Sequence, residues 1–276
     1  MSVLLSLLAA ASYGLGDFGG GMFSRRAGAW AVSLVAQLFG TTLVLVVVAV
    51  DGGSPTGADL AWAVLAGVGN GFGTAFLYRG LSSGRMGVVA PVSGVGCVLI
   101  PALAGIAGGE RPATLVWLGV VLALPAIWLV SREPVRDAAG PASGLLDGVL
   151  AGLGFGTMFA ALGQVPGEAG FLPLAVNQGI AAVAIIGTAL ALRADWVPRN
   201  RYALGGMASG ALGALATGLF QVATQHGYLT VAAVITALYP AFTVLLAATV
   251  LREHVHRAQG YGLALCAAAV ALVAAG

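Results

Sequence analysis

The first apolar stretch of the chain carries a lone carboxylate. Asp17 lies in SYGLGDFGGGMFSRR (residues 12–26), and Tyr13 lies one helical turn earlier on the same face. If this stretch spans a membrane, the charge costs roughly 2.5 kcal/mol or more and needs a partner or a purpose. We predict that Asp17 lines a substrate path, where it binds a cationic or amine group or carries a proton. The alternatives are a fixed ion pair, for which Arg79 is the candidate partner, and a side chain that reaches the membrane interface.

Further polar side chains interrupt later apolar stretches. Asn70 lies at the centre of GVGNGFGTAF, where its amide can contact a substrate or hydrogen-bond across a helix contact. Gln221 lies deep enough in its apolar stretch to line a cavity. Gln178 is expected at a contact between helices, and Tyr78 at the membrane interface.

Prolines fall inside two apolar stretches at corresponding positions. Pro91 and Pro101 lie in APVSGVGCVLIP, and Pro240 lies in ITALYPAF. Because proline has no N–H, each one removes a backbone hydrogen bond and can bend or locally open a helix. We predict that the three prolines form gating elements; a packing kink is the alternative. Polar groups at these bends complete the set of predicted substrate-binding residues, which comprises Tyr13, Asp17, Asn70, Arg79, Ser93, Gln221, Thr236 and Tyr239.

Catalytic, cofactor and metal motifs are missing from the sequence. Glu253, His254 and His256 are close in LREHVHR, but residues i and i+2 of a helix face different ways and a fourth ligand is lacking. GVGNGFG has no lysine after it, so it is not a phosphate loop. Cys97 and Cys266 lie singly inside apolar stretches, as buried cysteines commonly do. We therefore expect no enzyme activity, no cofactor and no metal. We also expect no nucleic-acid partner, since the basic residues are spread singly over connections.

Membrane-spanning helices must position these side chains. The chain is 59% hydrophobic and only 8% charged, whereas a soluble domain averages about 25% charged residues. Ten apolar runs of about 18 to 24 residues follow one another, and helices are the structure that satisfies their backbone groups in hydrocarbon. The predicted spans are residues 3–23, 30–50, 60–81, 87–107, 113–131, 145–164, 171–192, 203–224, 230–251 and 258–275.

The arginines predict the orientation of these spans. All twelve basic residues are arginine; eleven fall at odd-numbered connections and only Arg111 falls at an even one. By the positive-inside rule the odd connections are cytoplasmic. Both termini are therefore predicted outside the bacterial inner membrane.

The second half of the chain repeats the first. A shift of 143 residues lays residues 84–119 over 227–262 without a gap and matches Glu110 with Glu253 at equivalent helix ends, where both are expected to cap or pair. The repeats are predicted to cover residues 1–131 and 144–276. Because each repeat holds five helices, an odd number, the second must be inverted relative to the first, as in many secondary transporters.

The repeated motifs point to a family. The pattern G…VVAPVS…P…GGERP…G and its partner AAVITALYPAFTVLLAATVLREHVHRAQGYG resemble the EamA family of the drug/metabolite transporter superfamily. The resemblance covers essentially the whole chain as two tandem repeats. It implies an all-α membrane protein with ten transmembrane helices in two inverted five-helix repeats around a central cavity. Members of the family often place their termini in the cytoplasm, opposite to the orientation that the arginines predict here.

A secondary transporter is the function that these features favour. We expect it to move a small organic metabolite by alternating access, with efflux as the usual direction in the family and proton coupling through Asp17. A passive facilitator fits the sequence equally well. A non-transporting membrane scaffold or sensor, and an intramembrane enzyme, are the alternatives from other classes. The expected partners are the lipid bilayer and a small-molecule substrate, and the expected oligomeric state is a monomer or a homodimer.

Overall fold

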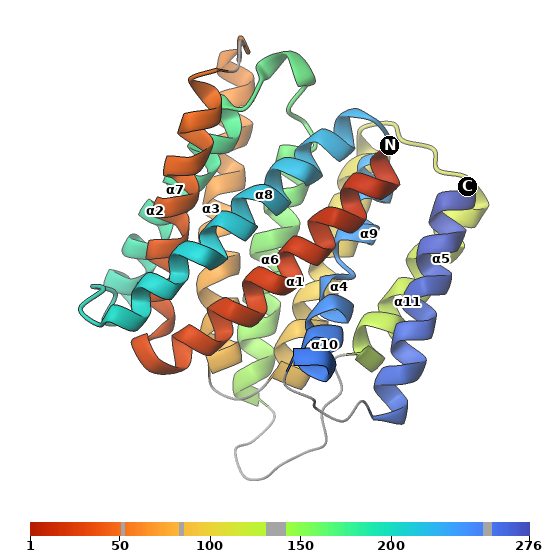
Figure 1. Cartoon of the computed structure of the whole chain (residues 1–276). Coiled ribbons are helices and arrows are strands. Elements are labelled where there is room, and N and C mark those ends of the chain that lie inside the picture. Colours follow the sequence, from red (N-terminus) through yellow and green to blue (C-terminus); the bar gives the residue numbers. More distant parts are fainter. Residues whose placement is uncertain (51–52, 83–85, 131–141, 251–255) are drawn as a thin grey trace.

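Helices make up nearly all of the described chain. The computed structural model describes residues 1–50, 53–82, 86–130, 142–250 and 256–276 (Figure 1), and no strand occurs among them. The α-helices are α1 (Ser2–Ala27), α2 (Ala29–Val48), α3 (Gly57–Ser82), α4 (Met86–Ala107), α5 (Thr114–Val130), α6 (Ala142–Leu162), α7 (Leu172–Ala191), α8 (Gly206–Gln225), α9 (Leu229–Thr236), α10 (Tyr239–Val250) and α11 (Arg257–Ala275). Two short 3-10 helices, η1 (Gly167–Ala169) and η2 (Arg201–Gly205), precede α7 and α8.

Most of these helices have the length and composition of membrane spans. Within the described ranges, eight segments are long and apolar enough to cross a membrane, and Leu229–Leu246, which joins α9 to α10, is one of them. Two shorter apolar helices, Val92–Ala107 and Thr114–Val130, accompany them. Each run predicted from the sequence coincides with one helix, except that the run 230–251 coincides with the pair α9 and α10.

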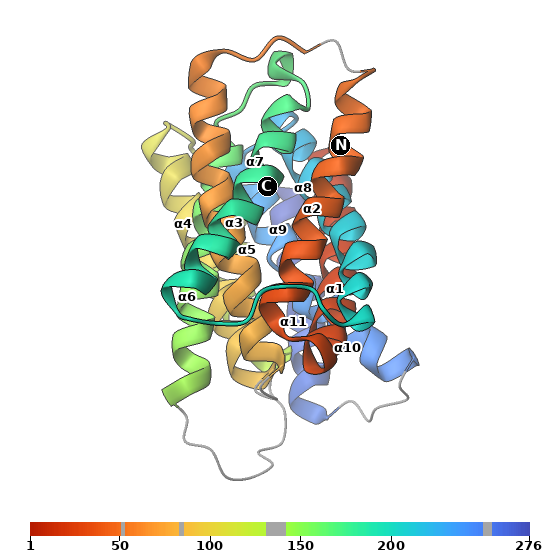
Figure 2. The ribbon, with the colours of Figure 1, turned by 90° about the vertical axis from the view of Figure 1, so that its left-hand side faces the viewer.

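Both chain termini lie at the same end of the helical assembly (Figure 1). The last turn of α1, with Arg25 and Arg26, and the α7–α8 connection, with Arg193, Arg199 and Arg201, lie at the opposite end (Figure 2). We call this opposite end the arginine-rich end. If successive spans alternate in direction, the odd-numbered connections, which carry these arginines, must lie at one end of the bundle, as they do here.

The helix expected over residues 230–251 is interrupted. α9 ends at Thr236, a turn follows at 237–238, and α10 begins at Tyr239. Pro240 supplies no N–H for the carbonyl of Thr236, so the regular hydrogen-bond pattern cannot continue there. α10 then diverges from the bundle near the arginine-rich end (Figure 2). By contrast, α4 runs unbroken through Pro91 and Pro101.

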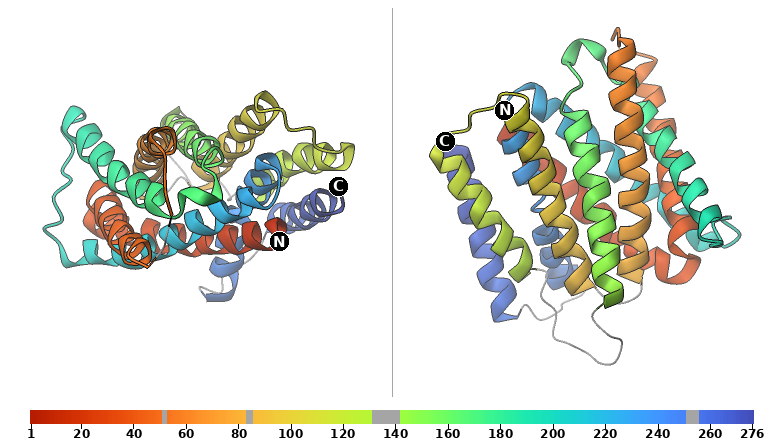
Figure 3. Two further views of the ribbon diagram at one scale, coloured as in Figure 1. Left: turned by 90° about the horizontal axis from the view of Figure 1, so that it is seen from above. Right: turned by 180° about the vertical axis from the view of Figure 1, so that it is seen from behind.

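Glycines let the helices approach closely. In the contact between α3 and α6, a Cβ built on Gly154 would lie 2.8 Å from the Cα of Gly73. In the contact between α8 and α2, a Cβ on Gly210 would lie 2.7 Å from the carbonyl carbon of Ala36. Only glycine fits backbones at this separation, as expected for helix association in membranes. α5 and α11 pack on each other as a pair at one side of the bundle (Figure 3).

A carboxylate at one helix end caps another helix far along the chain. Glu110, after α4, accepts hydrogen bonds from the backbone N–H groups of Leu229 and Thr230, the second at 3.1 Å, and from Thr230 Oγ1 at 2.7 Å. The first N–H groups of α9 thereby find partners, and the negative charge stabilises the positive end of the helix dipole. Glu110 is therefore a cap, one of the two roles that the sequence suggested for it. Its sequence counterpart, Glu253, lies outside the described residues.

Candidate functional site

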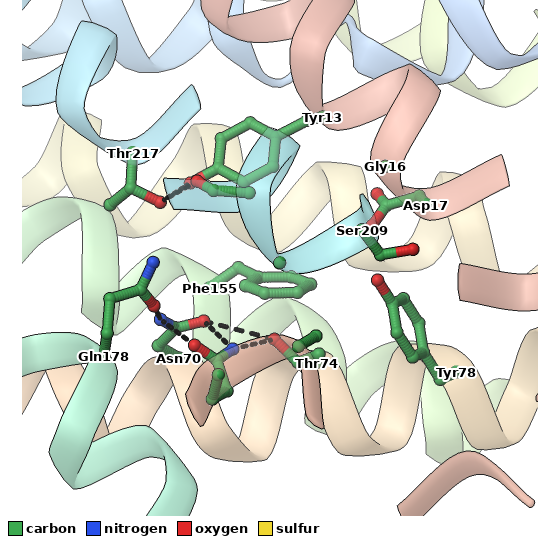
Figure 4. Close-up of a pocket in the computed structure, with 14 residues that line it drawn as sticks. Tyr13, Gly16, Asp17, Asn70, Thr74, Tyr78, Phe155, Gln178, Ser209 and Thr217 are labelled. Atoms are coloured by element: carbon green, nitrogen blue, oxygen red, sulfur yellow. Dashed lines mark hydrogen bonds between the residues drawn. The ribbon is translucent and has the colours of Figure 1, made fainter. Parts of the chain in front are cut away.

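A small polar cavity lies between helices of both halves of the chain. It has a volume of about 30 Å³, which is room for about two water molecules at 10–15 Å³ each. Figure 4 shows how the side chains around it lie. The lining comprises Tyr13, Gly16 and Asp17 of α1, Ala36 and Gln37 of α2, Asn70, Thr74 and Tyr78 of α3, Phe155 of α6, Gln178 of α7, and Ser209, Gly210, Gly213 and Thr217 of α8.

Amide side chains form a network along one wall of this cavity. Asn70 Nδ2 donates to Gln178 Oε1 at 2.9 Å and to Gln37 Oε1 at 3.4 Å. Asn70 Oδ1 accepts from Gln37 Nε2 at 3.2 Å and from Thr74 Oγ1 at 3.1 Å, and Gln37 Nε2 also donates to Thr74 Oγ1 at 3.1 Å (Figure 4). Asn70 thus uses its full hydrogen-bonding capacity within the protein. It organises its neighbours and has no polar site left for a ligand.

Gln178 is the member of the network with free donors. Its Oε1 accepts the hydrogen bond from Asn70, so the NH₂ group points away from the network (Figure 4). Within the described ranges, Gln178 Nε2 donates to no other residue. Two N–H groups of an otherwise buried side chain therefore remain available at the cavity.

Tyr13 is held against α8. The Tyr13 hydroxyl lies 2.7 Å from Thr217 Oγ1, and Thr217 Oγ1 donates its own hydrogen to the carbonyl of Gly213 at 2.7 Å. Tyr13 must therefore donate to Thr217. Its ring also meets the edge of Phe159, with the ring centroids 5.9 Å apart. These two contacts hold Tyr13 in the wall of the cavity.

Asp17 lies at the end of the cavity away from the amide network. It is half-buried, and Tyr78 and Ser209 line the same end (Figure 4). Among the described residues, none donates a hydrogen bond to the Asp17 carboxylate or forms an ion pair with it. A carboxylate in hydrocarbon without a partner is costly, and such residues in membrane proteins mark substrate or proton paths.

A second, smaller chamber adjoins the first. Its volume is about 10 Å³, and its lining comprises Tyr13, Asp17, Cys97, Phe155, Phe159 and Tyr239. Three of these residues, Tyr13, Asp17 and Phe155, also line the larger cavity. Tyr239, directly after the break between α9 and α10, hydrogen-bonds to Ser93 of α4 at 2.8 Å. This hydrogen bond therefore ties α4 to the start of α10 beside this chamber.

The structure pairs Arg79 with a residue that the sequence did not suggest. The expected candidate was Asp17, but Arg79 Nε donates to Asp147 Oδ1 of α6 at 2.9 Å and an N–H of its guanidinium contacts the same oxygen. The guanidinium also lies over the ring of Phe76, 4.5 Å from its centroid. The pairing with Asp17 was wrong because α3 packs along α6, which brings Asp147 within reach. Arg79 lines neither chamber.

Breaking the Arg79–Asp147 pair is expected to destabilise the protein. The Asp147 side chain is 10% exposed and that of Arg79 36%, so we expect Arg79→Gln or Asp147→Asn alone to lower the free energy of unfolding by about 1–3 kcal/mol, between the values for exposed and buried pairs. The double variant should lose less free energy of unfolding than the two single variants lose together, because it leaves neither charge without its partner. The free energy of unfolding of the native protein, the two single variants and the double variant is measured in detergent mixtures. Strict additivity would show that the two groups do not interact.

The remaining predicted residues lie away from both chambers. Gln221 donates to the carbonyl of Gly170 at 3.2 Å, and Thr236 is fully buried; the oxygens Gln221 Oε1 and Thr236 Oγ1 find no partner among the residues described. Pro101 and Pro240 belong to α4 and α10, and the side chain of Pro91 lies outside the described part. Of these residues, Gln221, Thr236, Pro101 and Pro240 line neither chamber.

Several lining residues were missed from the sequence. Gln37, Thr74, Ser209 and Thr217 carried no motif, and Gln178 was assigned to a helix contact only. Tyr78 is 3% exposed in the structure and is not the interfacial aromatic that its position suggested. The available signal was the scarcity of polar side chains within apolar runs: an amide such as Gln37 in the middle of a span is itself unusual.

Comparisons with known proteins agree with this architecture. A family model described as the EamA-like transporter family matches residues 1–132 and 142–275. A solved structure titled "Crystal structure of protein" is similar over 99% of this chain and 98% of its own, with a TM-score of 0.75 and 15% sequence identity, a likeness in fold alone. No curated protein matches the sequence. With two family matches spanning nearly all of its length, the chain belongs to the EamA-like transporter family, within the drug/metabolite transporter superfamily.

Proposed function

We propose that the protein is a secondary transporter that moves a small organic metabolite across the bacterial inner membrane by alternating access. The observation that carries this proposal is the polar cavity, which α1, α2 and α3 of the first half and α6, α7 and α8 of the second enclose together. A site shared by the two halves is the arrangement that alternating access needs, because relative motion of the halves opens it to either side.

The proposal includes ten spans in two inverted repeats, residues 1–131 and 144–276. The packing partners support it: α3 packs along α6 and α1 along α8, and the 143-residue shift carries the first pair onto the second. The arginine-rich end is proposed to face the cytoplasm, with both termini outside. Efflux is the proposed direction, as is usual in the family.

The proposed roles of individual residues follow their places around the cavity. Asp17 is proposed to contact the substrate or to exchange a proton with it, and Tyr13 and Asn70 to shape the site. Pro240, with the Ser93–Tyr239 hydrogen bond, is proposed to form a gate beside the second chamber.

A native cysteine tests alternating access without knowledge of the substrate. Cys97 is buried and lines the second chamber, whereas Cys266 is buried in α11 and lines neither chamber. A charged, membrane-impermeant thiol reagent is applied to right-side-out and to inside-out vesicles. In a Cys266→Ala protein, we expect Cys97 to react from both sides, more slowly than in unfolded protein.

The matched control is the Cys97→Ala protein, in which Cys266 should stay unmodified from either side. Reaction of Cys97 from one side only would exclude alternating access. No reaction from either side, with full reaction after unfolding in SDS, would instead support a non-transporting scaffold.

A further inference from the structure

The polar groups that remain unused around the larger cavity define its ligand. At one end the Asp17 carboxylate has no described partner, and at the other the Gln178 NH₂ group has two unused N–H donors. The first is an acceptor with a negative charge, and the second is a neutral donor group. Neither Asn70 nor Tyr13 offers a further donor, because the network and Thr217 occupy theirs.

Among the described residues, the lining of the two chambers carries one negative charge and no positive charge. Asp17 is the one charged side chain among the described residues that line either chamber. Arg79, the arginine that the sequence suggested as a partner for Asp17, forms its ion pair with Asp147 and lines neither chamber. A site with a single negative charge in a medium of low dielectric constant favours one positive charge on its ligand.

From these contacts we infer that the cavity selects a small monocation: a protonated amine whose other end carries an uncharged hydrogen-bond acceptor, such as an amide or ester carbonyl. The ammonium group pairs with Asp17, between the aromatic rings of Tyr13 and Tyr78, and the carbonyl accepts from Gln178 Nε2. This inference rests on the proposed transport function and names the class of molecule that the site takes.

The same groups disfavour other ligand classes. A free amino acid would place its carboxylate where no described cation can neutralise it, so it should bind less well than its amide. A neutral amide would leave the Asp17 carboxylate unpaired. An amine without a carbonyl would leave both N–H groups of Gln178 unused.

The cavity must widen before it holds such a molecule, since its present volume is about 30 Å³. Gly213 of α8 lines the cavity, and a Cβ built on it would meet nothing within 4 Å, so the wall has free space at this position.

Matched probes test the inference in the purified full-length protein. The probes are valinamide, isobutylamine (the same amine without the carboxamide), valine and N-acetylvalinamide; glycinamide and phenylalaninamide extend the size range. Binding is measured by calorimetry at about pH 7.5, at which most of the α-amino group, with its pKa of about 8, is still protonated. We expect the best-fitting amino amide to bind about tenfold more tightly than isobutylamine or valine, the value of one good hydrogen bond or of one neutralised charge. N-acetylvalinamide should not bind.

Variants of Gln178 test whether this residue contacts the carbonyl end of the ligand. Gln178→Met should abolish the preference for valinamide, so that this variant binds valinamide and isobutylamine with equal affinity. Gln178→Lys supplies the missing positive charge and should reverse the preference from valinamide to valine. Gln164→Met, at an exposed position at the end of α6, is the matched control and should change none of the affinities. The unfolding temperature of each variant shows whether it is folded.

Three results would overturn the inference: valine binding as tightly as valinamide in the native protein, N-acetylvalinamide binding as tightly as valinamide, or no binding of any amino amide. Labelling of Cys97 from both sides would leave the transport function intact in each case. Failure of Cys97 to be labelled from both sides would overturn the transport function itself. The binding test and the labelling test therefore distinguish a wrong ligand class from a wrong function.

Discussion

The Asp17→Asn variant is expected to lose transport by about tenfold to a hundredfold while it remains folded. The amide is close in shape to the carboxylate but has no charge, so it forfeits a charge-assisted contact worth about 1.5–3 kcal/mol. Because no described residue bonds to the Asp17 side chain, the substitution breaks no internal contact. Flux of labelled valinamide in proteoliposomes measures the effect, with the unfolding temperature as the check on folding.

Exchange experiments distinguish the two roles of Asp17. If the carboxylate binds the substrate, exchange of labelled for unlabelled substrate without a gradient falls together with net transport. If it only carries a proton, exchange survives and accumulation against a gradient is lost. Asp195→Asn, on the exposed connection between α7 and α8, is the control for a removed charge. Flux through Asp17→Asn equal to that of the native protein would remove Asp17 from the site.

The Gly210→Ala variant is expected to lose about 1–3 kcal/mol of stability, the usual cost of overpacking. The added methyl group would meet the backbone of α2 at Ala36, including its Cα at 2.8 Å and its carbonyl oxygen at a still shorter distance. Backbone atoms cannot move aside as a flexible side chain would, so α8 must shift away from α2.

Gly213→Ala, three residues later in α8, is the matched control. A Cβ at Gly213 meets nothing within 4 Å. Alanine also favours a helix over glycine by about 0.5–1 kcal/mol, so this variant should be as stable as the native protein or slightly more so. Unfolding by increasing amounts of SDS compares the stabilities of the two variants. Equal stabilities would show that the α2–α8 contact tolerates a wider separation than the structure gives it.

The helical architecture was predictable from the sequence because it depends on local properties. Length, apolar composition and short polar breaks predict each run by itself, and the runs coincide with the helices observed. The break before Pro240 was also predictable, since a missing N–H acts within one turn. That Pro91 and Pro101 leave α4 unbroken was not, because the surrounding helices decide whether a freed carbonyl is tolerated.

The site was predictable only in part, since it depends on which helices meet. Asp17, Tyr13 and Asn70 were recognisable from their own runs as polar groups out of place in hydrocarbon. Gln178 could not be assigned to the cavity until α7 was placed beside α3. For the same reason, Arg79 could be matched in depth with Asp17, but its true partner depends on the packing of α3 along α6.

Two contacts link the halves of the chain at opposite ends of the bundle: Glu110 with the start of α9 at the end of the termini, and Arg79 with Asp147 at the arginine-rich end. Under alternating access, a motion that opens one face breaks one contact and keeps the other. The half-exposed ion pair weakens as ionic strength rises, whereas the cap, which is made largely of hydrogen bonds to backbone N–H groups, is screened less. Added salt should therefore tilt the conformational equilibrium toward the form open at the arginine-rich end, and the rate of Cys97 labelling from that side would report the tilt.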